Sequence, residues 1–236
     1  MKRLIFVSLA VLLFPLAAQA KTEPCGGNAP ESLVSSLLKQ APGLRAEVLR
    51  LALNASRCAA AKGYVKRQEL LTVIDYSLPS DKPRLFTFNV AARTLLFREL
   101  VAHGKNSGGN RASFFSNSPG SLATSLGLFV TADTYTGSNG YSLRLRGLEE
   151  GVNDMAMDRA IVMHGASYVS RAAINALGRL GRSWGCPAVR REMARKIIDT
   201  VKGGSPIFAY YPDRTWLESS LFFRNPDDRG TAVATR

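Results

Sequence analysis

The sequence predicts an α+β fold: a mainly antiparallel sheet system with a late helix, preceded by an N-terminal helical segment. Apolar residues recur at helical spacing from Glu31 to about Lys62. From Leu70 the pattern changes to short strand-like runs separated by Gly and Asn turns. Helical spacing returns after Cys186, and no internal repeat occurs.

Two helices are expected in the N-terminal segment, residues 21–70. A first apolar stripe runs from Leu33 to Leu38, and Pro42-Gly43 interrupts it. We expect the pair to pack on the main domain, residues 71–215, with a substrate-binding role as the alternative; a tail follows at 216–236. The second apolar face comprises Leu44, Val48, Leu51, Ala52 and Ala55.

The strand-like runs after Leu70 are short and bounded by turn residues. They lie at residues 85–90, 94–103, 126–131, 141–145, 160–164 and 206–211. A loop rich in Gly, Ser and Asn covers residues 104–120. The late helix is expected to end at Gly203-Gly204. Its apolar face comprises Val189, Met193, Ile197, Ile198 and Val201.

Residues 1–20 are expected to be a signal peptide, so that the mature chain begins at Lys21 in the periplasm or cell envelope. Lys2-Arg3 forms a positive start, Leu4–Leu16 is almost wholly apolar, and Ala18-Gln19-Ala20 is a small-x-small cleavage site. An uncleaved anchor is the alternative, but the apolar run is short for a span of about 20 residues. No later segment is apolar enough to cross a bilayer, so we expect no stable membrane span after cleavage.

The chain of 236 residues has a formal net charge of +13. In an exported protein such a surface is attracted to anionic wall polymers or lipid headgroups. Lys and Arg are scattered along the whole chain, and no basic-aromatic motif of nucleic-acid binding occurs. We therefore expect no nucleic-acid partner.

Cysteine usage suggests one disulfide and one free thiol. The three cysteines are Cys25, Cys58 and Cys186, and in an oxidising compartment two of them are expected to pair. Cys25 and Cys58 both lie near the N-terminus, so their pairing would leave Cys186 free. The alternative is that Cys186 is itself a structural half-cystine.

The segment from Ser183 to Pro187 is the most informative part of the chain. Pro187 suits the first position of a helix, because its missing N–H has no partner there anyway. Cys186 would then lie at the helix N-cap, where the dipole favours a thiolate and lowers the thiol pKa. Gly181 and Gly185 would let the backbone approach a substrate closely, and exposed N–H groups beside the cysteine could form an oxyanion hole. These parts fit acyl transfer through a thioester.

The two histidines, His103 and His164, are the candidate bases. Each ends an apolar run and is followed by a glycine, so the pattern does not choose between them. The carbonyl of Gly165 could orient the His164 ring. The alternative for either is an ordinary, partly buried histidine. Two histidines and one free cysteine lack tight ligand spacing, so we expect no metal and no cofactor.

These motifs carry a resemblance to a known family. His164-Gly165 followed by Ser183-Trp184-Gly185-Cys186 resembles the signature of the L,D-transpeptidase (YkuD-type) family, His-Gly then Ser/Thr-His-Gly-Cys. The chain is most similar to the divergent murein branch, over roughly residues 75–212. The resemblance implies a β-sandwich-like catalytic domain that acts on peptidoglycan stem peptides. It also extends through residues 101–105, 116–120, 125–129 and 181–189.

The resemblance also implies roles for individual residues. Cys186 would be the nucleophile and His164 its general base. The carbonyl of Gly165 would hold the imidazole, and Ser183 and Gly185 would shape the pocket.

Three departures from the family pattern concern the acceptor side of the site. Trp184 stands where the family has a histidine, so that histidine's role would be lost or would move to His103, while Trp184 stacks on substrate or packs. The family's arginine two positions after the cysteine is absent; Ala188 is there, and Arg190, four positions after the cysteine, is the candidate for contact with the substrate or oxyanion. The spacing from histidine to cysteine is also longer than usual.

The resemblance implies an L,D-transpeptidase. Cys186 would attack the carbonyl of the L-centred diamino acid in one stem and release the terminal D-alanine, and an amine of another stem would resolve the thioester. With water as acceptor, the same site would be an L,D-carboxypeptidase or endopeptidase. A non-catalytic murein-binding module is the third alternative. A carbapenem is expected to acylate Cys186.

Overall fold

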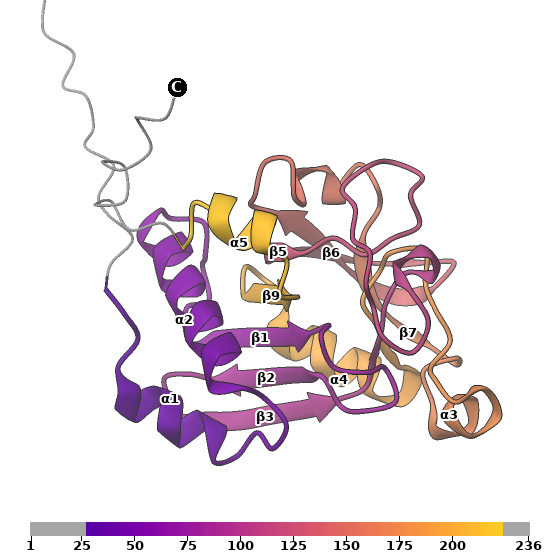
Figure 1. Ribbon diagram of the computed structural model, residues 1–236, viewed down its shortest axis with the longest axis horizontal. Coiled ribbons are helices and arrows are strands. Elements are labelled where there is room, and N and C mark those ends of the chain that lie inside the picture. Colours follow the sequence, from indigo (N-terminus) through magenta and orange to yellow (C-terminus); the bar gives the residue numbers. More distant parts are fainter. Residues whose placement is uncertain (1–26, 224–236) are drawn as a thin grey trace, which may run out of the picture.

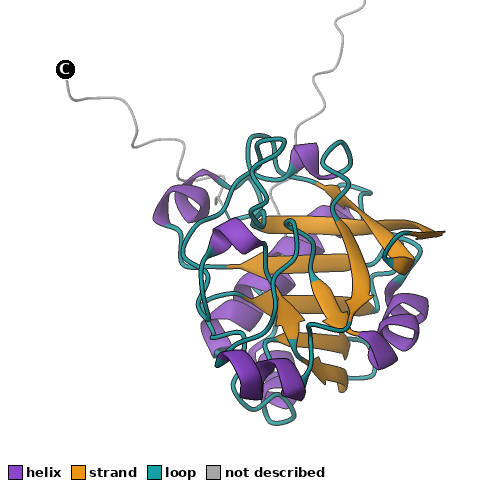
Figure 2. Ribbon diagram, turned by 90° about the vertical axis from the view of Figure 1, so that its right-hand side faces the viewer, coloured by secondary structure: helices purple, strands orange, loops and turns teal. Residues whose placement is uncertain are grey.

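The computed structural model describes residues 27–223, which build one mixed nine-stranded sheet with helices packed around it (Figure 1). The strands are β1 (Leu70–Asp75), β2 (Leu85–Asn89), β3 (Thr94–Glu99), β4 (Val101–Ala102), β5 (Gly127–Gly137), β6 (Gly140–Gly147), β7 (Val162–Ala166), β8 (Ala188–Arg190) and β9 (Pro206–Tyr210). Their order is β3-β2-β1-β9-β5-β6-β7-β8-β4. Among these described strands, β1 with β9 and β7 with β8 are parallel, and the other pairs are antiparallel. The predicted α+β fold is confirmed, and Figure 2 shows the sheet curling as its strands change direction.

The helices are α1 (Glu31–Leu38), α2 (Ala46–Ala61), α3 (Arg171–Leu177), α4 (Arg191–Val201) and α5 (Arg214–Ser219), with short 3₁₀ helices η1 (Lys105–Ser107) and η2 (Asp154–Ala156). The predicted N-terminal pair is present as α1 and α2, and Gly43 takes a positive φ of 98° in the turn between them. Figure 1 shows both helices on the same side of the molecule, with α3 at the opposite end. Val48, Leu49 and Ala52 bury one face of α2, which packs on β1 and β9.

The core contains two long strands of five or six residues that are buried along their whole length, β1 and β9. Strands covered on both faces read as continuous apolar runs rather than as an alternation. For this reason the run that forms β1 could not be assigned as a strand by periodicity. Its place beside β9 joins the N-terminal hairpin to the rest of the sheet.

The prediction that Pro187 opens a helix is wrong. Residues 188–190 form β8 between β7 and β4, and α4 begins at Arg191. Val101 and Ala102 of β4 and His164 to Ala166 of β7 supply the pairing partners, so these residues are drawn into the sheet before the helix starts. Cys186 therefore lies in the loop before a strand and receives no helix dipole.

The C-terminal boundary expected at residue 216 is also wrong, because it falls inside α5. Trp216 of this helix is buried against Phe208 and Tyr210 of β9, with ring centroids 5.7 and 6.2 Å away. The predicted signal peptide and the polar end of the tail lie outside the described residues. Within residues 27–223, no helix is long and apolar enough to span a bilayer.

Candidate active site

The loop that carries Cys186 is held by hydrogen bonds at both ends. The Ser183 hydroxyl donates to the Cys186 carbonyl at 2.6 Å and accepts from the Gly185 N–H at 3.1 Å, which closes a tight turn. The Ser183 N–H donates to the His103 carbonyl at 3.0 Å. Gly185 has a φ of 120°, and a Cβ there would lie 2.8 Å from the Ala123 carbonyl oxygen. This position therefore requires glycine.

The thiol of Cys186 is buried, and Cys186 is the free cysteine among the described residues. Its sulfur lies 3.5 Å from the Val162 N–H and 3.8 Å from the Ala160 carbonyl oxygen, to which the thiol donates. Ala160 has a left-handed φ of 52°, a strained conformation for a residue with a Cβ. Cys58, in contrast, is disulfide-bonded, and Cys25 lies outside the described residues.

Burial raises the pKa of the Cys186 thiol above its ordinary value, while the Val162 N–H and the charge of Arg159 act in the opposite direction. We expected a lowered pKa from a helix N-terminus, and the observed strand before α4 removes that cause. The resting site thus holds a neutral thiol.

Arg159 is a residue of this site that the sequence analysis missed. Its guanidinium makes four hydrogen bonds of 2.5–3.0 Å to the loop of residues 116–125. A Cβ on Gly185 would lie 3.4 Å from its Nη2 atom, so the cation sits directly behind the cysteine loop. Burial lowers the pKa of Arg159 and the charge of Cys186 raises it. No sequence motif marks this residue, because its partners are 34 to 43 positions away.

His164 lies on β7, next to the strand that follows the cysteine. It pairs with Ala188 of β8, the second residue after Cys186. Its Nδ1 lies 3.2 Å from the Gly165 carbonyl oxygen. A carbonyl only accepts, so Nδ1 carries the hydrogen and Nε2 keeps a lone pair. Burial lowers the pKa of His164, which keeps the ring neutral.

His103 has the opposite arrangement. Its Nδ1 lies 2.8 Å from Nη2 of the fully buried Arg84, so Nδ1 must accept and Nε2 donates to the Gly108 carbonyl at 3.4 Å. Burial, with the charge of Arg84, lowers the pKa of His103 to about 4. The lone pair of this ring is already used. His103 contacts the cysteine loop through its backbone carbonyl, which accepts a hydrogen bond from the Ser183 N–H.

The profile of the L,D-transpeptidase catalytic domain matches residues 40–210 of this chain. The chain belongs to this family. The matched region includes α2 as well as the whole sheet.

The solved structures to which this chain is similar share little sequence identity with it. One from Mycobacterium smegmatis is 15% identical with a TM-score of 0.38, over 61% of this chain and 59% of that chain. L,D-transpeptidase 1 of Mycobacterium tuberculosis is 16% identical with a TM-score of 0.34, over 61% and 62%. The helical cell shape determining protein of Campylobacter jejuni is 13% identical with a TM-score of 0.41, over 65% and 53%. The chain thus spans less than two thirds of these proteins, and a search of curated proteins finds no match.

Of two residues that depart from the L,D-transpeptidase signature, Trp184 is exposed beside the cysteine and Arg190 is held in ion pairs. Trp184 is 73% exposed, with the Lys105 ammonium 6.0 Å from its ring centroid, so its ring is open to a ligand. The Arg190 guanidinium instead makes a two-pronged ion pair with Glu99, at 2.6 and 2.8 Å, and a third contact with Glu192. Arg190 is therefore committed to joining β8 to β3.

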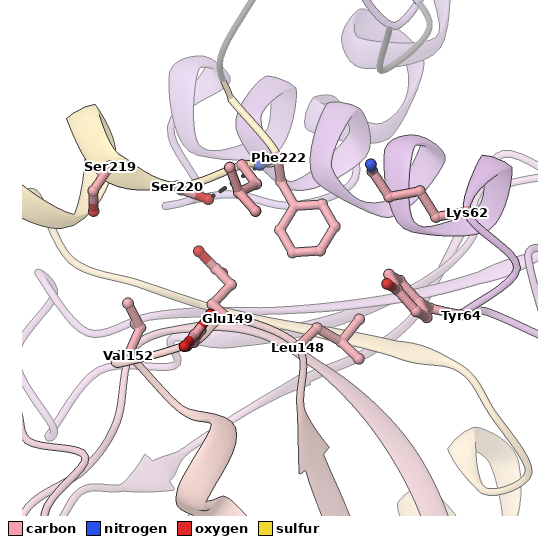
Figure 3. Close-up of a pocket in the computed structure, with 10 residues that line it drawn as sticks. Lys62, Tyr64, Leu148, Glu149, Val152, Ser219, Ser220 and Phe222 are labelled. Carbon is pink, nitrogen blue, oxygen red and sulfur yellow. Dashed lines mark hydrogen bonds between the residues drawn. The ribbon is translucent and has the colours of Figure 1, made fainter. Parts of the chain in front are cut away.

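Cavities of ligand size lie around the sheet, and two of them have to be compared with the site. One, of about 380 Å³, is lined by His164, Gly165 and the start of α4. The other, of about 310 Å³, lies between the end of α2, the turn after β6 and the chain after α5. Figure 3 shows the Phe222 ring projecting into this second cavity above Leu148. It includes neither Cys186 nor His164. Within the described ranges, no group of three acidic, His or Cys side chains could hold a metal ion.

Proposed function

We propose that this member of the L,D-transpeptidase family is a cysteine acyltransferase of peptidoglycan stem peptides. Cys186 is the nucleophile and His164 is its base. The observation that carries this proposal is the hydrogen bonding of the two side chains: the Cys186 thiol donates to the Ala160 carbonyl, and His164 Nδ1 faces the Gly165 carbonyl, which leaves Nε2 with a lone pair on the adjacent strand. His103, whose lone pair is bound to Arg84, is a structural histidine.

The first step forms a thioester. Nε2 of His164 takes the thiol proton as the Cys186 sulfur attacks the carbonyl carbon of the L-centred diamino acid. The imidazolium then returns that proton to the leaving amine of D-alanine as the peptide bond breaks. An amine of another stem attacks the thioester, its proton passes through His164 to the sulfur, and a cross-link forms. Water in place of the amine gives a trimmed tripeptide.

Three groups favour negative charge at the sulfur during this reaction. The N–H groups of Val162 and of Cys186 itself point to it, and Arg159 provides a positive charge behind the loop. These groups oppose the effect of burial, and they replace the helix dipole that the sequence suggested.

The compartment follows from the substrate. Peptidoglycan lies outside the cytoplasmic membrane, so we place the protein in the periplasm or cell envelope, in agreement with the expected signal peptide. The disulfide at Cys58 supports an oxidising compartment.

Acylation by a carbapenem tests the nucleophile. We expect the intact mass to rise by one carbapenem per chain and to stay unchanged in Cys186→Ala. Iodoacetamide is the control for access to the thiol. If iodoacetamide labels Cys186 and the carbapenem does not, or if the adduct persists in Cys186→Ala, the proposed nucleophile is wrong.

A further inference from the structure

The cavity beside His164 carries two positive charges and no negative one. It lies between the turn of the β5–β6 hairpin, the end of β7 and the first turns of α4. Its volume of about 380 Å³ is in the range of small-ligand sites. Arg191 and Arg195 are its charged lining residues, and neither Asp nor Glu takes part.

The acidic residues nearby bond to other groups, although the charge of Asp199 also acts on Arg195. Glu192 pairs with Arg190 at 2.9 Å, and Asp199 pairs with Lys202 at 2.8 Å. In the described part of the chain, no hydrogen bond or ion pair engages the guanidinium of Arg191. Its five donors are therefore available to an anion.

Arg195 is positioned in advance. Its guanidinium stacks over the Tyr141 ring at 4.4 Å from the centroid. The Tyr141 hydroxyl is in turn fixed by a 2.7 Å hydrogen bond to Asp199. A stacked guanidinium loses little further freedom on binding and presents a planar fork that matches a carboxylate.

Close packing of α4 on β7 fixes the first turns of this helix relative to His164. A Cβ on Gly165 would lie 2.8 Å from the Ala194 Cβ and 3.0 Å from the Arg191 Cα. Only glycine at this position allows the helix to approach so closely. The backbone positions of Arg191 and Arg195 are therefore fixed relative to the candidate base, His164.

We propose that this cavity binds a free carboxylate of the peptide substrate, through Arg191 and Arg195. This inference rests on the proposed function, and it names the chemical feature of the stem peptide that the chain recognises. Two carboxylates qualify, that of the terminal D-alanine and that on the side chain of the diamino acid. Peptides amidated at one or the other distinguish them.

The test is calorimetric binding of a disaccharide-tetrapeptide to Cys186→Ala, which cannot turn over. We expect Arg191→Gln combined with Arg195→Gln to weaken binding at least tenfold, and amidation of the recognised carboxylate to weaken it equally. The two changes should not add: the double variant should bind the amidated peptide as well as Cys186→Ala alone binds the amidated peptide. Lys196→Gln is the matched control, since it removes one charge from the same helix outside the cavity and should bind as the parent does.

The outcomes separate this proposal from the proposed function. Unchanged affinity in the double variant, with a wild type that converts the peptide, would overturn the carboxylate site alone. A wild type that neither binds nor converts the peptide would overturn both. If loss of the stacking of Arg195 on Tyr141 prevents folding of the double variant, the single variant Arg191→Gln replaces it, because Arg191 is exposed. Arg191→Gln alone should weaken binding severalfold.

Discussion

At the scale of single residues, burial raises the pKa of the Cys186 thiol, and the Val162 N–H and the charge of Arg159 oppose that effect. Because burial raises the pKa of the thiol, iodoacetamide alkylation of the wild type should have its midpoint above the value of about 8.5 for a free thiol. Arg159→Met should raise that midpoint further and slow alkylation at pH 8 severalfold, whereas Arg159→Lys should retain most of the rate. Arg214→Met on α5 removes an exposed charge as a control.

A wild-type midpoint below that of a free thiol would contradict the burial account. A midpoint that Arg159→Met leaves unchanged would show that this cation does not act on the sulfur.

Removal of His164 should affect activity, whereas removal of His103 should affect stability. His164→Ala should abolish turnover while the protein stays folded, because it removes the free Nε2. His103→Ala should lower the free energy of unfolding by about 1–3 kcal/mol, because it removes one of the buried acceptors of Arg84, whose remaining bonds go to the carbonyls of Leu78 and Val101. Urea unfolding and turnover per folded molecule measure both effects. An inactive but fully stable His103→Ala, with an active His164→Ala, would reverse our assignment.

At the scale of secondary structure, α5 is fastened to the sheet by a buried carboxylate. Glu149 accepts from the Trp216 indole at 2.9 Å and from the Leu128 N–H at 2.7 Å, and burial raises its pKa. Figure 3 shows Glu149 beneath Ser220, where the chain leaves the helix. The end of the described chain is thus part of the folded domain.

Trp216 should therefore matter more than its place near the C-terminus suggests. Trp216→Phe keeps most of the ring packing but removes the donor to Glu149, and should cost about 1–3 kcal/mol. Trp216→Ala should cost about 3–5 kcal/mol. The exposed Trp184→Ala is the matched control in urea unfolding and should change stability little. Equal stability of the two alanine variants would refute the fastening role.

Elements were predictable from the sequence where local periodicity decides the structure. The helices α1 and α2 lie where their apolar stripes predict them. The strand β8 was not predictable, because Val189 and Met193 have helical spacing and only the distant partners β7 and β4 make residues 188–190 a strand. Trp216 was missed for a similar reason, since its contacts are on β9 and after β6.

Over the whole molecule, the cysteines divide into two chemical states. Cys58 is disulfide-bonded and Cys186 is free, so the oxidised, denatured chain should contain one titratable thiol. A thiol-specific reagent under denaturing, non-reducing conditions counts it. Cys186→Ala should give none, and three thiols in the oxidised wild type would contradict the assignment.

The candidate site, too, was predictable only where local sequence motifs mark its residues. Cys186, His164 and Gly165 could be named from local motifs and the family resemblance. The choice between the histidines required their hydrogen-bond partners, and Arg159, Arg191 and Arg195 are recognisable only once the sheet brings distant segments together. Arg190, singled out from its spacing, is occupied by Glu99.

Conversion of a disaccharide-tetrapeptide, followed by mass spectrometry with and without a D-amino acid, tests the central claim most directly. Our account predicts exchange of the terminal D-alanine or formation of a cross-linked dimer, lost in both Cys186→Ala and His164→Ala. Tripeptide as the sole product would keep the thioester mechanism and make water the acceptor. Product from Cys186→Ala, or none from a folded wild type, would contradict the claim that this thiol acts on murein peptides.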